Sequence, residues 1–403
     1  MTFAIIRSVF VLAIALPLGT GLALAEKKYG PGVTDTEIRI GQTMPYSGPA
    51  SLYSTVGKAM AAYLEKINAE GGVNGRQIRL LSLDDGYSPP KAVEQTRKLV
   101  EQDEVLLIFG TLGNAVNTAI HKYLNIKKVP HLLIASTSVK WNDPQNFPWT
   151  IAFQPNQKTE ARVYTKYLLK NHPNTKIAIL YQHDDFGGGY VQAVKEALGE
   201  QAATMIVAEA SYEVSDPSLD SQVVSLQDSG ADTLLIFASP KFAGMAIRKA
   251  YDIGWRPLKL MTLASANVAS VLQPAGLEKS VGVISSNFLK DPTDPQWKDD
   301  AATKEWLRWM KRYYPDGSIA DAYNVYGYSY SQALVEILKR CGDDLTRENV
   351  MKQATNLKNI ELPMFLPGIK ITTSPTDYRI IKQLQLMRFD GKRWVLFGDV
   401  IED

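Results

Sequence analysis

Short apolar runs alternate with amphipathic segments along most of the chain. From residue 38 onward, runs rich in β-branched residues are followed by stretches with helical periodicity, an order typical of parallel βαβ units. The first series predicts strands at residues 38–44, 77–83, 105–109 and 131–135, with helices at 57–69, 89–102 and 116–124. Glycine-containing turns separate them, as at Asn74-Gly75.

A second series of the same kind begins after residue 155. Its predicted strands are 176–181, 204–208, 233–238 and 259–263, and its helices are 190–198, 219–228 and 242–253. From about residue 281 we expect another strand, helices at 297–313, 321–340 and 347–356, and a closing hairpin of 384–389 and 394–400 around Asp390-Gly391. The sequence therefore predicts an α/β fold of two doubly wound parallel-sheet lobes, with a ligand cleft between them.

The N-terminus has the three parts of a secretory signal. Arg7 precedes an apolar run at residues 9–16, and Ala23-Leu24-Ala25 provides a small-residue cleavage site. The run is shorter than the roughly 20 residues of a membrane span and is followed by Pro17, so we expect residues 1–25 to be a cleaved signal peptide. The residue directly after the cleavage site is not a cysteine, so a lipid anchor on the new N-terminus has no attachment point. We expect a freely diffusing protein that is not embedded in the membrane.

Composition narrows the class of protein. The chain of 403 residues is 45% hydrophobic and 21% charged, which is ordinary for a globular protein of two domains. Its formal net charge of +2 does not indicate a surface that binds nucleic acid or an anionic membrane. A single cysteine, Cys341, excludes an internal disulfide and a multi-cysteine metal site. We expect neither a metal nor another cofactor.

The motifs of common enzyme classes are missing. The sequence has no G-x-S-x-G, no phosphate-binding loop and no H-E-x-x-H, and its four histidines are scattered. Asp84-Asp85 could be interpreted as an acid pair, but adjacent side chains at a strand end point in opposite directions. We expect the protein not to be an enzyme.

Several stretches resemble the periplasmic binding proteins of branched-chain amino acid transporters, the leucine/isoleucine/valine-binding family, which includes receptors for aromatic acids. The matching stretches are Ile-Arg-Ile-Gly at 38–41, Ser-Gly-Pro at 47–49, Ile-Asn-Ala-Glu-Gly-Gly-Val-Asn-Gly at 67–75, Asp-Asp at 84–85 and Lys-Ile-Ala-Ile-Leu at 176–180. The resemblance runs in order along nearly the whole chain after the signal. Where well-known members have a disulfide, this chain has Tyr87 and Gly113.

The resemblance implies a type I periplasmic binding fold, with two lobes joined by a three-crossing hinge near Trp149, Ser285 and Pro367. Lobe I would comprise residues 26–149 plus 286–366, and lobe II residues 150–285 plus 367–403. It also implies that a monomer in the periplasm closes on a small carboxylate and delivers it to an ABC permease in the inner membrane. A ligand-sensing module of a receptor or regulator, which can use the same fold, is the alternative of a different class.

A carboxylate site is expected where two strands end. The loop with Gly113 and Asn114 precedes a helix, whose first N–H groups and dipole favour an anion. Ala135, Ser136 and Thr137 end the next strand. The resemblance implies that Asn114, Ala135 and Thr137 hold the ligand carboxylate and neighbouring polar atoms. Asn114 as a helix N-cap, and serine and threonine as ordinary turn formers, are the alternatives.

Further ligand contacts are expected from both lobes. Tyr46 and Tyr53 flank the first strand-to-helix loop, and Tyr53 matches a family position that contacts the ligand side chain; packing on their own lobe is the alternative. From the second lobe, Phe186 matches an aromatic residue that covers the ligand, and Ser239 and Ser265 end their strands at the same rim.

Ala264 departs from the family pattern. Members that bind amino acids have an acidic residue near this position, which pairs with the ligand ammonium, and Ala264-Ser265-Ala266 provides none. Because an unpaired buried ammonium is costly, we favour a carboxylate without an α-amino group, such as an aromatic acid. Asp184, Asp185 or Asp291 could still supply the charge, so a branched-chain or other amino acid remains the alternative ligand.

Overall fold

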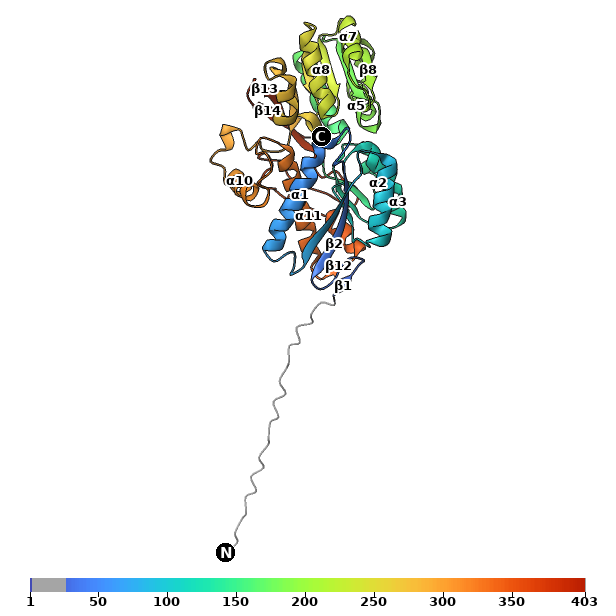
Figure 1. Ribbon diagram of the computed structural model, residues 1–403, viewed down its shortest axis with the longest axis vertical. Helices are drawn as coiled ribbons and strands as arrows, with labels where there is room; N and C mark the ends of the chain where they lie inside the picture. The colour runs from blue at the N-terminus through green and yellow to red at the C-terminus, as the bar shows by residue number, and fades with distance from the viewer. Residues whose placement is uncertain (2–26, 403) are drawn as a thin grey trace.

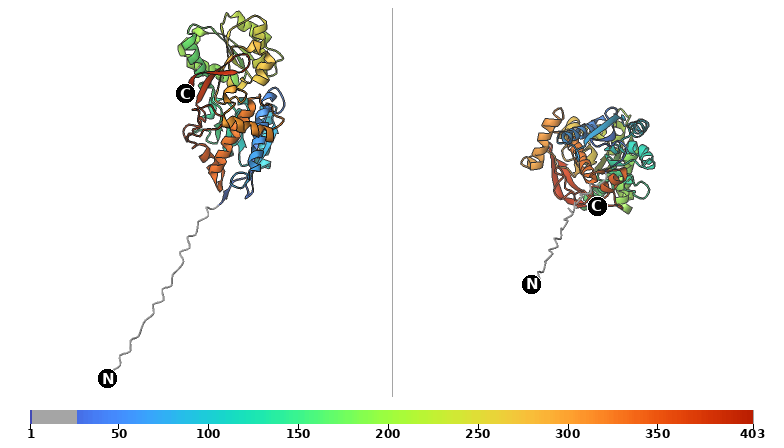
Figure 2. Two further views of the ribbon diagram at one scale, coloured as in Figure 1. Left: turned by 90° about the vertical axis from the view of Figure 1, so that its left-hand side faces the viewer. Right: turned by 90° about the horizontal axis from the view of Figure 1, so that it is seen from below.

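Two β-sheets, each with its own helices, form the framework of the protein. The computed structural model describes residue 1 and residues 27–402, and it places the two units one above the other along the long axis (Figures 1 and 2). In this part of the chain a five-stranded sheet has the order β3-β2-β4-β5-β6. Its strands, all in parallel pairs, are β2 (Glu37–Met44), β3 (Gln77–Asp84), β4 (Ile108–Phe109), β5 (His131–Ile134) and β6 (Thr150–Ala152).

Helices from both ends of the chain cover this first sheet. The early ones are α1 (Ser54–Ala69), α2 (Pro89–Arg97), which continues as a π-helix at Lys98–Gln102, and α3 (Asn114–Ile126). The late ones are α10 (Ala301–Tyr313), α11 (Tyr323–Cys341) and α12 (Arg347–Ala354). Helices α1 and α11 lie against each other, and a Cβ atom at Gly327 would meet the Val56 carbonyl at 2.4 Å. Glycine at this position therefore permits the close approach.

The second sheet has seven strands in the order β14-β13-β11-β10-β9-β7-β8. The parallel strands are β7 (Ile177–Gln182), β8 (Ile206–Tyr212), β9 (Thr233–Phe237), β10 (Leu258–Met261) and β11 (Ile284–Asn287). The hairpin β13 (Gln383–Phe389) and β14 (Trp394–Glu402) adds antiparallel strands at one edge. Its helices include α4 (Gln157–Asn171), α5 (Asp185–Leu198), α7 (Asp220–Asp228) and α8 (Pro240–Asp252).

The predicted α/β fold class is confirmed, and several elements were missed, among them α4 and β6. Helix α4 escaped prediction because its buried face includes polar side chains such as Gln157 and Glu160, which weaken the apolar periodicity. Strand β6 is only three residues long. The strand predicted at 204–208 was partly wrong, because Ala202–Met205 is a short helix and β8 starts only at Ile206.

The chain passes between the two sheets more than once. It leaves the first sheet after β6, returns after β11 to α11, which packs on α1, and enters the second sheet again at β13. The lobe boundaries at 149/150, 285/286 and 366/367 stay a prediction. The expected signal peptide, residues 1–25, lies outside the described residues except for Met1. None of the described helices is long and apolar enough to cross a membrane.

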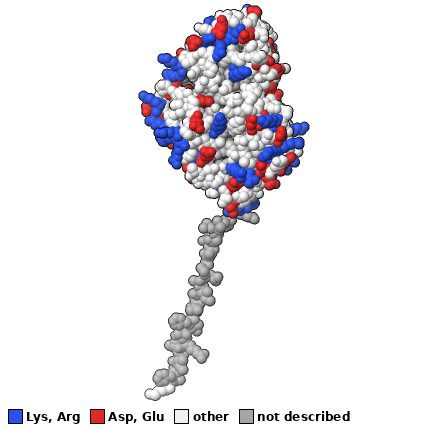
Figure 3. Space-filling view, viewed as in Figure 1, with Lys and Arg blue, Asp and Glu red and all other residues white. Residues whose placement is uncertain are grey.

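The visible surface carries charges of both signs. On the face shown in Figure 3, lysine and arginine side chains alternate with aspartate and glutamate side chains. Many charged side chains of the described chain form ion pairs, such as Lys66 with Glu70 at 2.9 Å and Arg340 with Glu336 at 2.8 Å.

His131, on β5, is a buried ionisable group in the first sheet. Its side chain is fully buried, and its Nε2 lies 2.7 Å from the Thr111 hydroxyl. Burial lowers the pKa of His131 to about 3, from an ordinary value of 6.5. Burial raises the pKa of Asp85 to about 6. A raised pKa of a carboxyl makes the folded protein more stable as the pH is lowered, whereas the lowered pKa of His131 makes it less stable.

We predict that His131→Gln reduces the acid sensitivity of folding. Between pH 6.5 and about 3 the unfolded chain binds a proton at His131 that the folded protein does not, so the free energy of unfolding falls as the pH is lowered. This group contributes a slope of up to about 1.4 kcal/mol per pH unit. Urea unfolding at several pH values between 5 and 7 gives the slope of the free energy of unfolding against pH for the wild-type protein and the variant. Equal slopes would contradict the prediction.

Candidate functional site: a neutral pocket between the sheets

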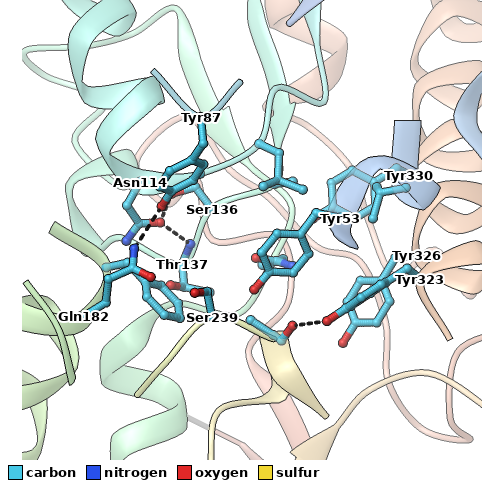
Figure 4. Close-up of a pocket in the computed structure, with 17 residues that line it drawn as sticks. Tyr53, Tyr87, Asn114, Ser136, Thr137, Gln182, Ser239, Tyr323, Tyr326 and Tyr330 are labelled. Atoms are coloured by element: carbon cyan, nitrogen blue, oxygen red, sulfur yellow. Dashed lines mark hydrogen bonds between the residues drawn. The ribbon is translucent and has the colours of Figure 1, made fainter. Parts of the chain in front are cut away.

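A pocket lies where the loops that follow strands of both sheets face each other (Figure 4). Its empty space, including the opening to solvent, is about 570 Å³. Four sets of residues line it. They are Tyr53, Val56 and Tyr87; Leu112, Gly113, Asn114, Ala135, Ser136, Thr137 and Gln154; Gln182, Phe186, Ser239 and Ala264; and Tyr323, Tyr326 and Tyr330.

Asn114 organises the polar end of this pocket. It is the first residue of α3, and Gly113, at φ +104°, occupies the N-cap position. The Asn114 Oδ1 accepts hydrogen bonds from the Ser136 hydroxyl and, at 3.2 Å, from the Thr137 N–H. Its Nδ2 donates to the carbonyl of Asp185 at 3.3 Å, across the cleft. The Asn114 side chain therefore fixes the loop after β5 and contacts the second lobe, instead of capping the helix.

The Thr137 hydroxyl is the unused polar group at this end. Its oxygen is buried and has no hydrogen-bond partner among the described residues. Ser136, in contrast, donates to Asn114 and accepts from the Trp141 indole N–H at 2.6 Å. The first N–H groups of α3 have no partner within the helix. A carboxylate placed here can accept hydrogen bonds from Thr137 and from the start of α3.

The second lobe contributes a wall of hydrogen-bonded side chains. The Gln182 Nε2 donates to Asp184 Oδ2 at 2.7 Å, and the Gln182 Oε1 accepts from the Tyr212 hydroxyl at 3.0 Å. The same Tyr212 oxygen accepts from the Ser239 N–H at 3.0 Å. Phe186, in the first turn of α5, is 8% exposed and completes this wall.

Tyrosines form the other end, to the right in Figure 4. Tyr323, Tyr326 and Tyr330 come from α11 at helical spacings of three and four residues, so they lie on one face. The Tyr323 hydroxyl donates to the Ala264 carbonyl at 2.8 Å, and the Tyr323 ring centroid lies 5.2 Å from that of Tyr53. The three α11 tyrosines were not predicted as site residues, although their spacing within the predicted helix was a visible signal.

Tyr87 packs on Gly113, at the two positions where the family resemblance implied a missing disulfide. A Cβ atom at Gly113 would lie 2.4 Å from the Tyr87 ring, so the ring fills the space that a side chain would need. The Tyr87 hydroxyl lies 3.4 Å from both Asp184 Oδ2 and Gln182 Nε2. The tyrosine therefore reaches the second lobe from the first.

Eight of the ten predicted ligand contacts line this pocket, and Tyr46 and Ser265 do not. The Tyr46 hydroxyl is hydrogen-bonded to Ser82 Oγ at 2.6 Å, within its own lobe. The Ser265 hydroxyl is buried and donates to the Ala238 carbonyl at 2.6 Å. The residues that the prediction missed are Val56, Tyr87, Leu112, Gln154, Gln182, Ala264, Tyr323, Tyr326 and Tyr330. Contact of any of these with a ligand stays a prediction.

None of the described residues that line the pocket has an acidic or basic side chain. Asp184 caps α5 and accepts from the N–H groups of Phe186 and Gly187. Asp185 is paired with Lys140, and Asp291 lines a different cavity. Burial raises the pKa of Tyr53 well above its usual value, so its hydroxyl stays neutral. In the described chain no three His, Cys, Asp or Glu side chains are grouped to hold a metal ion.

Sequence comparison assigns the family. The model of the family described as periplasmic binding protein matches residues 37–393. The chain belongs to the periplasmic binding protein family. The binding protein is 22% identical over 346 residues to Leu/Ile/Val-binding protein homolog 1 of Brucella abortus (strain 2308), a match that covers 85% of this chain and 90% of that relative. The resemblance to leucine/isoleucine/valine-binding proteins is thereby confirmed.

Solved structures confirm the type I fold of the binding protein. A branched-chain amino acid ABC transporter protein from Thermus thermophilus with bound valine has a TM-score of 0.81 at 15% identity, covering 92% of this chain and 98% of that one. The fatty acid ABC transporter substrate-binding protein from Thermomonospora curvata has a TM-score of 0.78 at 22% identity, covering 94% and 95%. At these identities the likeness establishes the fold alone.

The described conformation of the binding protein is closed by contacts between its lobes. Asp185 Oδ2, on α5, accepts from Lys140 Nζ and from the Thr118 hydroxyl, both at 2.7 Å. On the other side of the cleft, Asn267 Nδ2 donates to Asp321 Oδ1 at 2.6 Å. A hinged protein opens only by breaking these contacts. They therefore contribute to the balance between the open and closed forms.

We predict that Lys140→Met shifts the unliganded protein toward the open form. The pair with Asp185 is partly exposed, at 35% and 42%, so its loss changes the ratio of the two forms by up to about fivefold. Small-angle scattering in low salt would show a larger radius of gyration, and about 0.5 M salt would remove the difference. Lys158→Met is the matched control, because the Lys158–Glu196 pair has the same length of 2.7 Å but lies between α4 and α5. Equal expansion of both variants would contradict the prediction.

Proposed function

We propose that this periplasmic binding protein of the ABC transporter type captures a small carboxylate without an α-ammonium group and delivers it to an inner-membrane permease. An aromatic acid is the favoured ligand. The proposal includes export by the N-terminal signal, a monomeric protein and binding without chemical conversion.

The absence of a charged side chain among the described lining residues is the observation that carries the choice of ligand. A carboxylate can be stabilised there by neutral donors, namely the Thr137 hydroxyl and the start of α3, together with the helix dipole. An ammonium would need a carboxylate partner, and burying it unpaired costs several kcal/mol. The pocket therefore favours an anion over a zwitterion.

The tyrosine end favours a flat apolar body. Tyr53, Tyr323 and Tyr326 present ring faces and edges on which an aromatic ring can pack at ordinary stacking distances. Phe186 supplies another ring from the second lobe. A ligand with a carboxylate at one end and a ring at the other matches both ends of the pocket.

The names of relatives point to two ligand classes. Valine is bound in the Thermus protein, and the Thermomonospora protein is named for fatty acids. Both ligands carry a carboxylate, and only valine carries an ammonium. Amino acids are the second candidate class, because the Brucella relative is named for leucine, isoleucine and valine.

A thermal-shift screen of the refolded, ligand-stripped protein tests the proposal. The probes are aromatic acids, straight-chain carboxylates, dicarboxylates and branched-chain amino acids. A ligand at 100 times its dissociation constant stabilises the protein by about 2.7 kcal/mol, which gives a clear shift. We expect a shift with an aromatic acid and none with leucine. A shift with leucine alone would refute the ligand assignment.

We predict that Ala264→Asp reverses the preference of the pocket. Ala264 lines the pocket beside Tyr323, so an aspartate here would repel a bound carboxylate and pair with an ammonium. Affinity for the best acid should fall at least tenfold, and affinity for leucine should rise at least tenfold, as measured by calorimetry. Ala264→Asn is the matched control, because it adds similar bulk without charge. If both variants behave alike, size and not charge decides the preference.

A further inference from the structure

A second cavity lies directly beside the ligand pocket, on the other side of α11. Its empty space, including the opening to solvent, is about 530 Å³. Among the residues that the structure describes, Tyr326 alone lines both this cavity and the ligand pocket. On the same helix, Tyr323 and Tyr330 line the ligand pocket, whereas Ala322 and Val325 line the second cavity. The Tyr326 side chain therefore separates the two spaces.

Tyr326 is held in this position by aromatic packing. Its ring meets that of Phe288 edge to face at 5.5 Å between centroids, and it lies 6.3 Å from that of Tyr323. Phe288 is fully buried, and Tyr326 itself is only 6% exposed. These contacts are made by the ring, and the Tyr326 hydroxyl has no hydrogen bond to another described residue. A ring alone is therefore sufficient to form the partition.

The second cavity suits an uncharged apolar group. Eleven of its seventeen described lining residues are apolar, including Leu289, Val325 and Leu366. Its basic residue, Lys290, is paired with Asp300 at 3.0 Å. The buried Asp294 is paired with Arg393. Asp291 also lines the cavity and accepts hydrogen bonds from the N–H and the hydroxyl of Thr293. Because its lysine is already paired within the protein, the cavity offers no free cation for a second carboxylate.

We propose that Tyr326 sets the maximum length of the ligand and that the second cavity is the space from which it excludes an apolar tail. This inference rests on the proposed function, because it places the carboxylate near Asn114 and Thr137 and the body against the tyrosines. The ligand of the natural protein is then a compact acid that ends at the Tyr326 ring. Removal of the ring joins the two spaces and admits a longer chain.

Calorimetry with saturated straight-chain carboxylates from butanoate to dodecanoate tests this inference. In the wild-type protein, affinity should rise about fourfold with each methylene until the chain reaches Tyr326, and then fall. Tyr326→Ala should move this limit by several carbons. Tyr326→Phe is the matched control, because it keeps the ring and should keep the wild-type limit.

The outcomes separate the length selection from the choice of ligand. If Tyr326→Ala leaves the limit unchanged, or if Tyr326→Phe moves it equally, Tyr326 is not the partition and the inference is overturned. If the wild-type protein binds neither these carboxylates nor an aromatic acid, the proposed function fails and the inference fails with it. If it binds an aromatic acid but no straight-chain carboxylate of any length, the inference alone is overturned. A thermal melt checks the folding of each variant. Should Tyr326→Ala not fold, Tyr326→Leu replaces it, and the same shift of the limit is expected.

Discussion

The side chain of Asn114 connects the structural elements on which the pocket depends. One amide oxygen holds the loop after β5 through Ser136 and Thr137, and the amide nitrogen reaches the backbone of Asp185 in the second lobe. The amide oxygen of Asn114 is occupied by these contacts, and the start of α3 and the Thr137 hydroxyl have donors left for the ligand. The anion site is thus built from neutral groups, and their positions depend on the contact between the two lobes.

Neutrality of the pocket does not mean that acidic residues are absent nearby. Glu160, on α4, is fully buried and accepts hydrogen bonds from the hydroxyls of Tyr164 and Tyr190 and from the Leu263 N–H at 2.6 Å. Burial raises the pKa of Glu160. Its contact with Leu263 supports the turn that carries Ala264, so this carboxyl shapes the wall from behind without lining the pocket.

A transport role requires both lobes to contact the ligand, because a ligand favours the closed form only through its extra affinity for that form. The pocket meets this requirement. Its polar end and the α11 tyrosines belong with the first sheet, and Gln182, Phe186, Ser239 and Ala264 belong with the second. Lys140 and Thr118 add contacts to Asp185 outside the pocket. The energy of closure is therefore divided between ligand contacts and contacts of the protein with itself.

The sequence by itself determined most of the order of elements, the fold class and the residues at the polar end of the pocket. These follow from local patterns, namely strand and helix periodicity and a loop such as Gly113-Asn114 at the start of a helix. Tertiary structure decided which side chains face the cleft. Ser265 ends at the expected rim, but it turns to the Ala238 carbonyl, and Tyr46 turns to Ser82. Tyr323, Tyr326 and Tyr330 enter the pocket because α11 packs on α1, although some 200 residues separate them from Asn114. The direction of a side chain depends on contacts between segments far apart in the chain, and local periodicity does not encode those contacts.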